Sequence, residues 1–161
     1  MNNKGFSLPE LLAVIVLIAM IALITTPIVL NVIEDSSEDV FMDNALSLSK
    51  AADNYYTSLT LTSDTKLPIL ITFDNKKETN KYINNTTKQC ETSNERILEY
   101  GGQNPDTGNI YIDNNGNIYI AIFDKESNKC AIKNPGDKTV TITNDSIEEC
   151  KLDYDPCETY W

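Results

Sequence analysis

The sequence contains no histidine, and its 13 lysine and arginine residues are outnumbered by 24 aspartates and glutamates, so its net charge is −11. Proteins that bind nucleic acid concentrate positive charge on one surface, whereas the few positive charges of this chain are scattered. Direct binding of nucleic acid is therefore not expected. The lack of histidine also removes the side chain that most often serves as a general base or a metal ligand.

Motifs that carry chemistry are equally scarce. No two cysteines form a CxxC pair, which together with the lack of histidine argues against a zinc site. The sequence has no glycine-rich phosphate loop and no motif of paired carboxylates. We therefore expect no catalytic residue, no cofactor and no metal, and an enzyme is the least expected class. One alternative is a calcium site that joins Asp106 and Asp113 with Asn114 or Asn115, although scattered loop acids are usually only solvated.

A long apolar run lies near the N-terminus. Residues 11–24 are all aliphatic residues, alanine or methionine, and apolar residues resume at 28–30. Twenty helical residues span roughly 30 Å, the thickness of a bilayer core. Lys4 precedes the run and several acidic residues follow it, so the positive-inside tendency places the N-terminus in the cytoplasm and exports the rest.

A single carboxylate, Glu10, stands at the start of this run. An unpaired charge in hydrocarbon costs several kcal/mol, and the next basic residue after Lys4 is Lys50. We therefore expect the partner of Glu10 on another molecule, unless its side chain reaches water or lipid headgroups. A secretory signal peptide is disfavoured because no small-x-small cleavage site follows the run. A plain membrane anchor would explain the run but not Glu10.

The stretch Gly5-Phe6-Ser7-Leu8-Pro9-Glu10-Leu11-Leu12 resembles the N-terminal signature of type IV prepilins and pseudopilins, and the resemblance covers roughly residues 4–35. It implies that a prepilin peptidase cuts between Gly5 and Phe6 and that Phe6 is then N-methylated. The new amine of a neighbouring subunit could neutralise Glu10, and such a buried pair would set the register of a filament. Within one subunit the same amine could also relieve Glu10 in the membrane.

Two prolines bear on the helix that this signature implies. Pro9 departs from the commonest family pattern, but it would lie in the first helical turn, where amide groups have no partner within the helix. Pro27 lies inside the helix and deprives the Leu23 carbonyl of its donor, which predicts a kink. Thr25 and Thr26 can partly satisfy the freed carbonyls. Two readings of Pro27 stay open: a static kink, or the point where the resemblance implies that the helix extends on filament packing.

The helical pattern continues to about residue 59. Apolar residues recur at alternating steps of four and three, which places them on one helical face. These residues are Phe41, Ala45, Leu48, Ala52, Tyr55 and Leu59. After a leader of residues 1–5, we therefore expect one helix. Its first half, residues 6–30, is apolar all round and its second half, residues 31–60, is amphipathic.

Residues 61–161 are expected to form an exported head with an antiparallel sheet. Residues 67–73 are strand-like, with Pro68 suggesting an edge strand, and residues 74–94 read as a polar loop. Two hairpins are predicted, over 109–123 and 129–143. The isoleucines that alternate in the first hairpin should face the helix; they are Ile110, Ile112, Ile118, Ile120 and Ile122. The fold class is α+β, a long helix packed against the sheet, which is also the architecture of pilins.

The four cysteines, Cys90, Cys130, Cys150 and Cys157, all lie in the C-terminal half. Export of this half would favour two disulfides. The sequence allows three pairings. Of these we expect Cys90–Cys130, tying the loop to the sheet, and Cys150–Cys157, closing the tail.

The leading interpretation is a structural subunit, a type IV pilin. The resemblance implies that a prepilin peptidase processes it and that assembly machinery polymerises it with identical or related subunits. Before assembly it would span the membrane lipid once, and afterwards it would lie in an extracellular filament. Two alternatives remain: a pseudopilin of a secretion or DNA-uptake system, and a membrane-anchored binding module that never polymerises.

Overall fold

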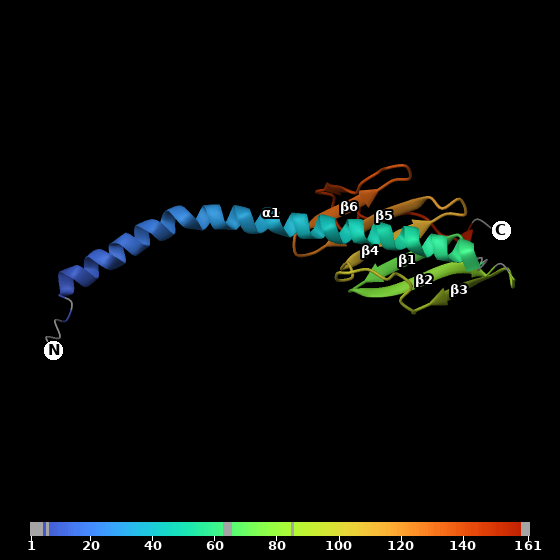
Figure 1. Ribbon diagram of the computed structural model, residues 1–161, viewed down its shortest axis with the longest axis horizontal. Helices are drawn as coiled ribbons and strands as arrows, with labels where there is room; N and C mark the ends of the chain where they lie inside the picture. The colour runs from blue at the N-terminus through green and yellow to red at the C-terminus, as the bar shows by residue number, and fades with distance from the viewer. Residues whose placement is uncertain (1–4, 6, 63–65, 85, 159–161) are drawn as a thin grey trace. The chain divides into compact units, whose positions relative to one another are not determined.

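A computed structural model describes residues 5, 7–62, 66–84 and 86–158, and consists of one long helix and one antiparallel sheet (Figure 1). The helix, α1, runs over Leu8–Thr62. The chain divides into two compact units, Met1–Ser37 and Glu38–Trp161, so that α1 contributes its first part to one unit and its last part to the other. We call them the N-terminal unit and the C-terminal unit.

The sheet of the C-terminal unit has seven strands in the order β3-β2-β1-β4-β5-β6-β7, and all neighbours are antiparallel. The strands are β1 (Ile69–Asp74), β2 (Lys77–Asn84), β3 (Gln89–Ser93), β4 (Thr107–Ile112), β5 (Ile118–Asp124), β6 (Lys129–Lys133) and β7 (Thr141–Thr143). The last part of α1 lies across one face of this sheet (Figure 1). This α+β arrangement confirms the predicted fold class.

The main core lies between α1 and the sheet. The predicted helical face supplies the buried side chains of Phe41, Ala45, Leu48 and Ala52, and Tyr55 packs against them half-buried. The sheet supplies the five isoleucines predicted to face the helix, each of them at most 3% exposed. The buried residues recur with a period of 3.6 along the helix and of 2 along the strands. Both sides of this interface could therefore be predicted from the sequence.

Both predicted hairpins are confirmed, as β4–β5 and β6–β7. In the first, the Asp113 carboxylate accepts hydrogen bonds from the N–H groups of Asn115 and Asn117, both at 2.8 Å, and so fixes the turn. Gly116 has a φ of +84°, and a Cβ there would lie 2.5 Å from the Tyr56 ring. Glycine is therefore required at this position by both conformation and space.

Two strand predictions were wrong. The segment after Pro68 is a central strand, β1, paired on one side with β2 and on the other with β4. Pro68 precedes the first residue of β1, so its missing N–H removes no hydrogen bond from the sheet. The polar stretch read as a loop forms β2 and β3. Its inward residues include Glu78 and Asn80, which hid the usual alternation of apolar and polar residues.

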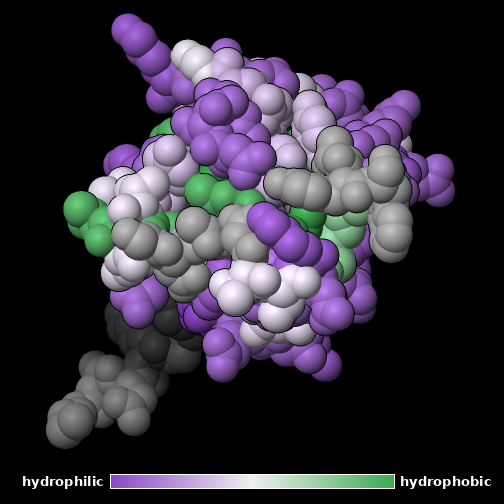
Figure 2. All heavy atoms as spheres, turned by 90° about the vertical axis from the view of Figure 1, so that its right-hand side faces the viewer, coloured by the Kyte–Doolittle hydropathy of each residue, from purple (hydrophilic) through white to green (hydrophobic). Residues whose placement is uncertain are grey.

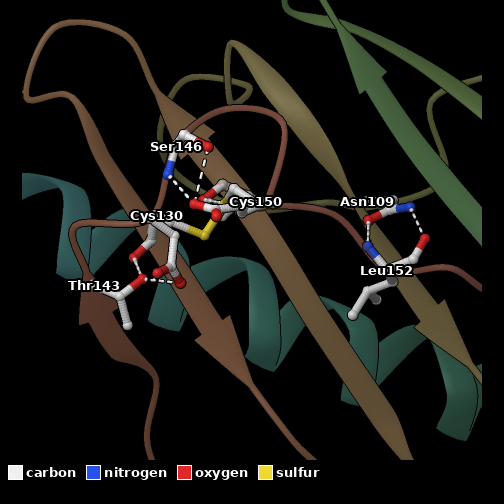
Figure 3. Close-up of a disulfide and its surroundings, with 9 residues drawn as sticks. Asn109, Cys130, Thr143, Ser146, Cys150 and Leu152 are labelled. Atoms are coloured by element: carbon white, nitrogen blue, oxygen red, sulfur yellow. Dashed lines mark hydrogen bonds between the residues drawn. A yellow bond between two sulfur atoms is a disulfide. The ribbon is translucent and has the colours of Figure 1, made fainter.

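All four cysteines are in disulfides, but the expected pairing was wrong. The bonds are Cys90–Cys157 and Cys130–Cys150, and Figure 3 shows the second of them. The physical reason is the strand order. Cys90 lies on β3 and Cys130 on β6, five inter-strand steps apart, which amounts to about 24 Å at the usual strand spacing. A disulfide requires its two Cα atoms within about 7 Å.

Residues 150–157, which we call the strap, run across the sheet face opposite α1 with a disulfide at each end. Between them the Asn109 side chain on β4 exchanges two hydrogen bonds with the Leu152 backbone, at 3.0 and 2.8 Å (Figure 3). The Tyr154 ring stacks on that of Tyr111, with centroids 4.7 Å apart, and Asp155 forms an ion pair with Lys81 on β2. Eight extended residues reach about 26 Å, enough to cross from β6 to β3.

The surface of the C-terminal unit carries few exposed large hydrophobic residues. Among its described residues, those that are exposed are Val40, Leu61, Ile147 and Tyr154, which are scattered along the chain. The face seen in Figure 2 is predominantly hydrophilic, with hydrophobic residues only in small areas. Scattered exposed hydrophobic residues are normal for a surface in contact with water.

Candidate functional site at the start of the helix

The first turn of α1 is closed by Ser7 and Glu10. The Glu10 carboxylate oxygen Oε2 accepts two hydrogen bonds from Ser7, one from its backbone N–H and one from its hydroxyl, both at 2.8 Å. The Leu11 N–H donates to the Ser7 carbonyl at 3.2 Å and begins the helical series. Ser7 is therefore the N-cap, and Glu10, three residues later, occupies the position of the acid in a capping box.

Sequence reasoning missed Ser7: it expected Glu10 to be relieved by another molecule, by the new amine of the same subunit, or by water and lipid headgroups. The signal was present, because a serine followed three residues later by glutamate, ahead of an apolar run, is the signature of a capping box. Pro9 is the second residue of α1 and gives up no hydrogen bond there, as predicted. Because Ser7 is uncharged, its hydrogen bonds do not neutralise the Glu10 carboxylate.

Gly5, the expected last residue of the leader, is exposed, and a Cβ built on it would meet no atom within 4 Å. Among the residues that the structure describes, nothing therefore requires glycine at this position. Phe6, the expected site of N-methylation, lies outside the described residues.

Between Glu10 and Thr26 the helix is apolar and exposed. Within the described residues, the segment Leu8–Thr26 is the one helical stretch long and apolar enough to cross a membrane, and none of it is buried. Its large hydrophobic side chains range from 42% exposed at Val16 to 79% at Leu8. So much contiguous apolar surface needs lipid or other helices around it.

Helix α1 continues through Pro27, whose side chain lies outside the description. The hydroxyls of the two threonines before Pro27 donate to carbonyls earlier in the helix. Thr25 donates to the Ile21 carbonyl at 3.1 Å and Thr26 to the Ala22 carbonyl at 2.6 Å. The carbonyl that Pro27 deprives of its donor is that of Leu23, and neither hydroxyl bonds it in these contacts. A kink at Pro27 and its role remain predictions.

The alternative calcium site is not assembled. Asp106 and Asp113 lie just before and just after β4, so six strand residues, about 20 Å, separate them. Asp113 is engaged in its turn, and Asp106 accepts a hydrogen bond from the Lys125 N–H at 2.9 Å. Over the described ranges, no group of three or more acidic or cysteine side chains is placed to hold a metal.

Replacing Ser7 by alanine should loosen the first turn of α1. The hydroxyl bond to Glu10 is lost, and loss of an N-cap side chain costs about 1 kcal/mol. We expect faster amide exchange at Leu11, whose N–H closes the first turn on the Ser7 carbonyl, in the full chain in detergent micelles. The matched control is Ser36→Ala, an exposed serine inside the same helix. Equal first-turn exchange in both variants would contradict the capping role.

Residues 1–26 match the family model described as the prokaryotic N-terminal methylation motif. Neither the curated proteins nor the solved structures gave a match.

The matched region contains Gly5, Ser7 and Glu10 and ends where the exposed apolar segment ends. The chain therefore carries a signature of the type IV pilin and pseudopilin type, followed by an α+β pilin-like fold. This supports a pilin-like or pseudopilin protein, and the apolar helix together with the motif fits anchoring in a membrane.

Proposed function

We propose that this chain is a filament subunit, a type IV pilin. A prepilin peptidase cuts it between Gly5 and Phe6, Phe6 is N-methylated, and assembly machinery polymerises the chain through α1 into a surface filament. Residues 1–5 are then the leader, residues 6–30 the membrane-spanning and filament-core part, residues 31–60 the amphipathic part, and residues 61–161 the exported head. The observation that carries the proposal is an exposed apolar helix with Glu10 in its first turn.

The geometry of Glu10 is compatible with a second, charged partner. Both bonds from Ser7 use Oε2, and within the described part of the chain no hydrogen bond reaches Oε1. The N–H of Ser7 belongs to the Phe6–Ser7 peptide bond, which survives a cut before Phe6. The mature protein would therefore keep the capping contact, with Oε1 left for the terminal amine of a neighbouring subunit.

Recognition by a peptidase gives glycine a reason to be at position 5. Neither packing nor a positive φ at Gly5 explains the residue among those described. A peptidase that needs the backbone to pass close to its catalytic groups would favour a residue without a side chain.

Mass spectrometry of the protein isolated from its own membranes tests the processing. We expect a chain that begins at Phe6 and carries one additional methyl group on its amine. A Gly5→Ala variant should keep all 161 residues, because its new Cβ would obstruct the peptidase but meet nothing in the protein itself. An unprocessed wild-type chain, or a first residue other than N-methylated Phe6, would contradict the proposal.

A further inference from the structure

Two polar side chains of β2 point into the core side of the sheet. Glu78 is 8% exposed and Asn80 is 1% exposed, and they lie opposite Phe73 and Ile71 of β1. They are two residues apart on one strand, so they share a face. A buried carboxyl group is costly unless it is hydrogen-bonded or neutral.

Both side chains hold the connection between β3 and β4, residues 94–106, which we call the 94–106 segment. The Ile97 N–H donates to Glu78 Oε1 at 2.8 Å, and Asn80 Nδ2 donates to the Glu95 carbonyl at 2.6 Å. The segment contains no helix and no strand, and its Leu98 is fully buried in the main core. These two β2 side chains therefore hold the first part of the segment, while Asn104 near its end donates to the Lys76 carbonyl at 2.9 Å.

The other oxygen of each side chain is unsatisfied. Among the described residues, Glu78 Oε2 and Asn80 Oδ1 are buried and have no hydrogen-bond partner. Turning the Asn80 amide over would not help, because Oδ1 would then face the Glu95 carbonyl. With Glu78 ionised, both of these oxygens are acceptors, and they belong to side chains two residues apart on one face of β2. A protonated carboxyl supplies a donor, because its O–H donates.

The charged and titratable groups that act on Glu78 come from the 94–106 segment. Arg96 is the nearby cation, but its Nε donates to the Leu98 carbonyl at 3.1 Å and its guanidinium lies over the Tyr100 ring. Burial, the largest cause, raises the pKa of Glu78 above its usual value, against the opposing effects of the Ile97 and Leu98 N–H groups, the Arg96 charge and the Asn80 amide. Burial also raises the pKa of Tyr100 to about 12, so this phenol stays neutral.

We propose that Glu78 and Asn80 form a proton-binding site that latches the 94–106 segment to β2. The protonated Glu78 carboxyl donates its O–H from Oε2 to Asn80 Oδ1 while Oε1 accepts from the Ile97 N–H. Loss of the proton leaves a buried charge beside an unpaired acceptor, and the segment loosens.

The direction of the pH dependence follows from linkage. A carboxyl whose pKa is higher in the folded than in the unfolded protein binds its proton more tightly when folded. Its contribution to stability is complete below the unfolded pKa and is lost as the pH rises through the folded pKa. The attachment of the 94–106 segment to Glu78 and Asn80 is therefore intact in acid and weakens as the pH rises.

Hydrogen exchange of the full chain in detergent micelles, followed by mass spectrometry between about pH 5 and pH 8 and corrected for intrinsic rates, tests this. We expect the protection of the 94–106 segment to fall by at most about tenfold per pH unit, the limit for one proton. The peptide that covers β5 should keep its protection.

In Glu78→Gln the amide donates at every pH, so protection of the 94–106 segment should stay high and lose its pH dependence. Glu99→Gln, an exposed carboxyl on the same segment, is the matched control and should behave as wild type.

The wild-type series alone can overturn the proposal. Protection that does not change with pH would mean that a water molecule, and not a proton, joins the two oxygens. Protection that changes with added Na⁺ or Ca²⁺ at one pH, and is otherwise constant, would mean a bound cation. A Glu99→Gln variant that lost the pH dependence would place the titrating group elsewhere.

Discussion

Glu10→Ala is expected to abolish filaments while leaving the C-terminal unit folded. The side chain lies in the first turn of an exposed apolar helix and makes no contribution to the main core. Removing one partner of a buried ion pair costs about 3 kcal/mol or more, because the other charge is left uncompensated in an apolar environment. For each subunit contact that amounts to more than a hundredfold in association. Repeated along a filament, this loss should prevent assembly.

Electron microscopy of filaments sheared from cells, with the subunit quantified in the membrane fraction, would measure this effect. Asp35→Ala, an exposed acid further along α1, is the control and should assemble normally. Glu10→Gln separates two roles, because its amide oxygen can still accept from Ser7 while the charge is gone. Normal filaments from Glu10→Gln would mean that capping and not charge pairing is the contribution of Glu10.

Removing the strap disulfides should have the largest effect on the stability of the C-terminal unit. The Cys90–Cys157 bond joins residues 67 apart, and the Cys130–Cys150 bond joins residues 20 apart. In the chain-entropy account, loops of these lengths correspond to about 4 and about 3 kcal/mol, respectively. We therefore expect the Cys90→Ala/Cys157→Ala double variant to lose about 4 kcal/mol of unfolding free energy, a large share of what a small domain has.

Denaturant unfolding of the full chain in detergent, with and without reductant, checks this expectation. Reductant should lower the midpoint of wild type and leave unchanged a variant in which all four cysteines are alanine. Hydrogen exchange would localise the loss, which in the Cys90/Cys157 variant should fall on β3 and the strap before β5. A loss below about 1 kcal/mol would show that Asn109, Tyr154 and Asp155 hold the strap without a covalent bond.

The elements that the sequence predicted correctly are those with local signals. The helix bears a continuous apolar stripe from Phe41 to Leu59, and the first hairpin has its glycine at the position where the turn needs a positive φ. The helix begins at Leu8, within two residues of the start at residue 6 that the family resemblance implied, and Pro9 marks a helix start nearby. The local signal of Ser7 was equally available, but it was read only as part of a family pattern.

The features that the sequence did not yield depend on distant partners. Strand β2 was missed because its inward residues Glu78 and Asn80 are polar. Their hydrogen bonds run to the backbone at Ile97 and Glu95, and no periodicity in the sequence indicates such distant partners. Disulfide pairing depends on strand order, and the strand order requires β2 and β3 to be known. The two errors therefore had one cause: once the polar stretch was taken for a loop, Cys90 was placed beside the wrong partner.

The strap also determines how the C-terminal unit would respond to pulling. A load applied at the tail is carried by covalent bonds into β3 through Cys157 and into β6 through Cys150, so strands near both edges of the sheet share it. Strands β3 and β6 could then be drawn apart no further than the strap allows, even where the hydrogen bonds between the strands break. A subunit whose head bears traction at the cell surface would gain mechanical resistance from its last residues.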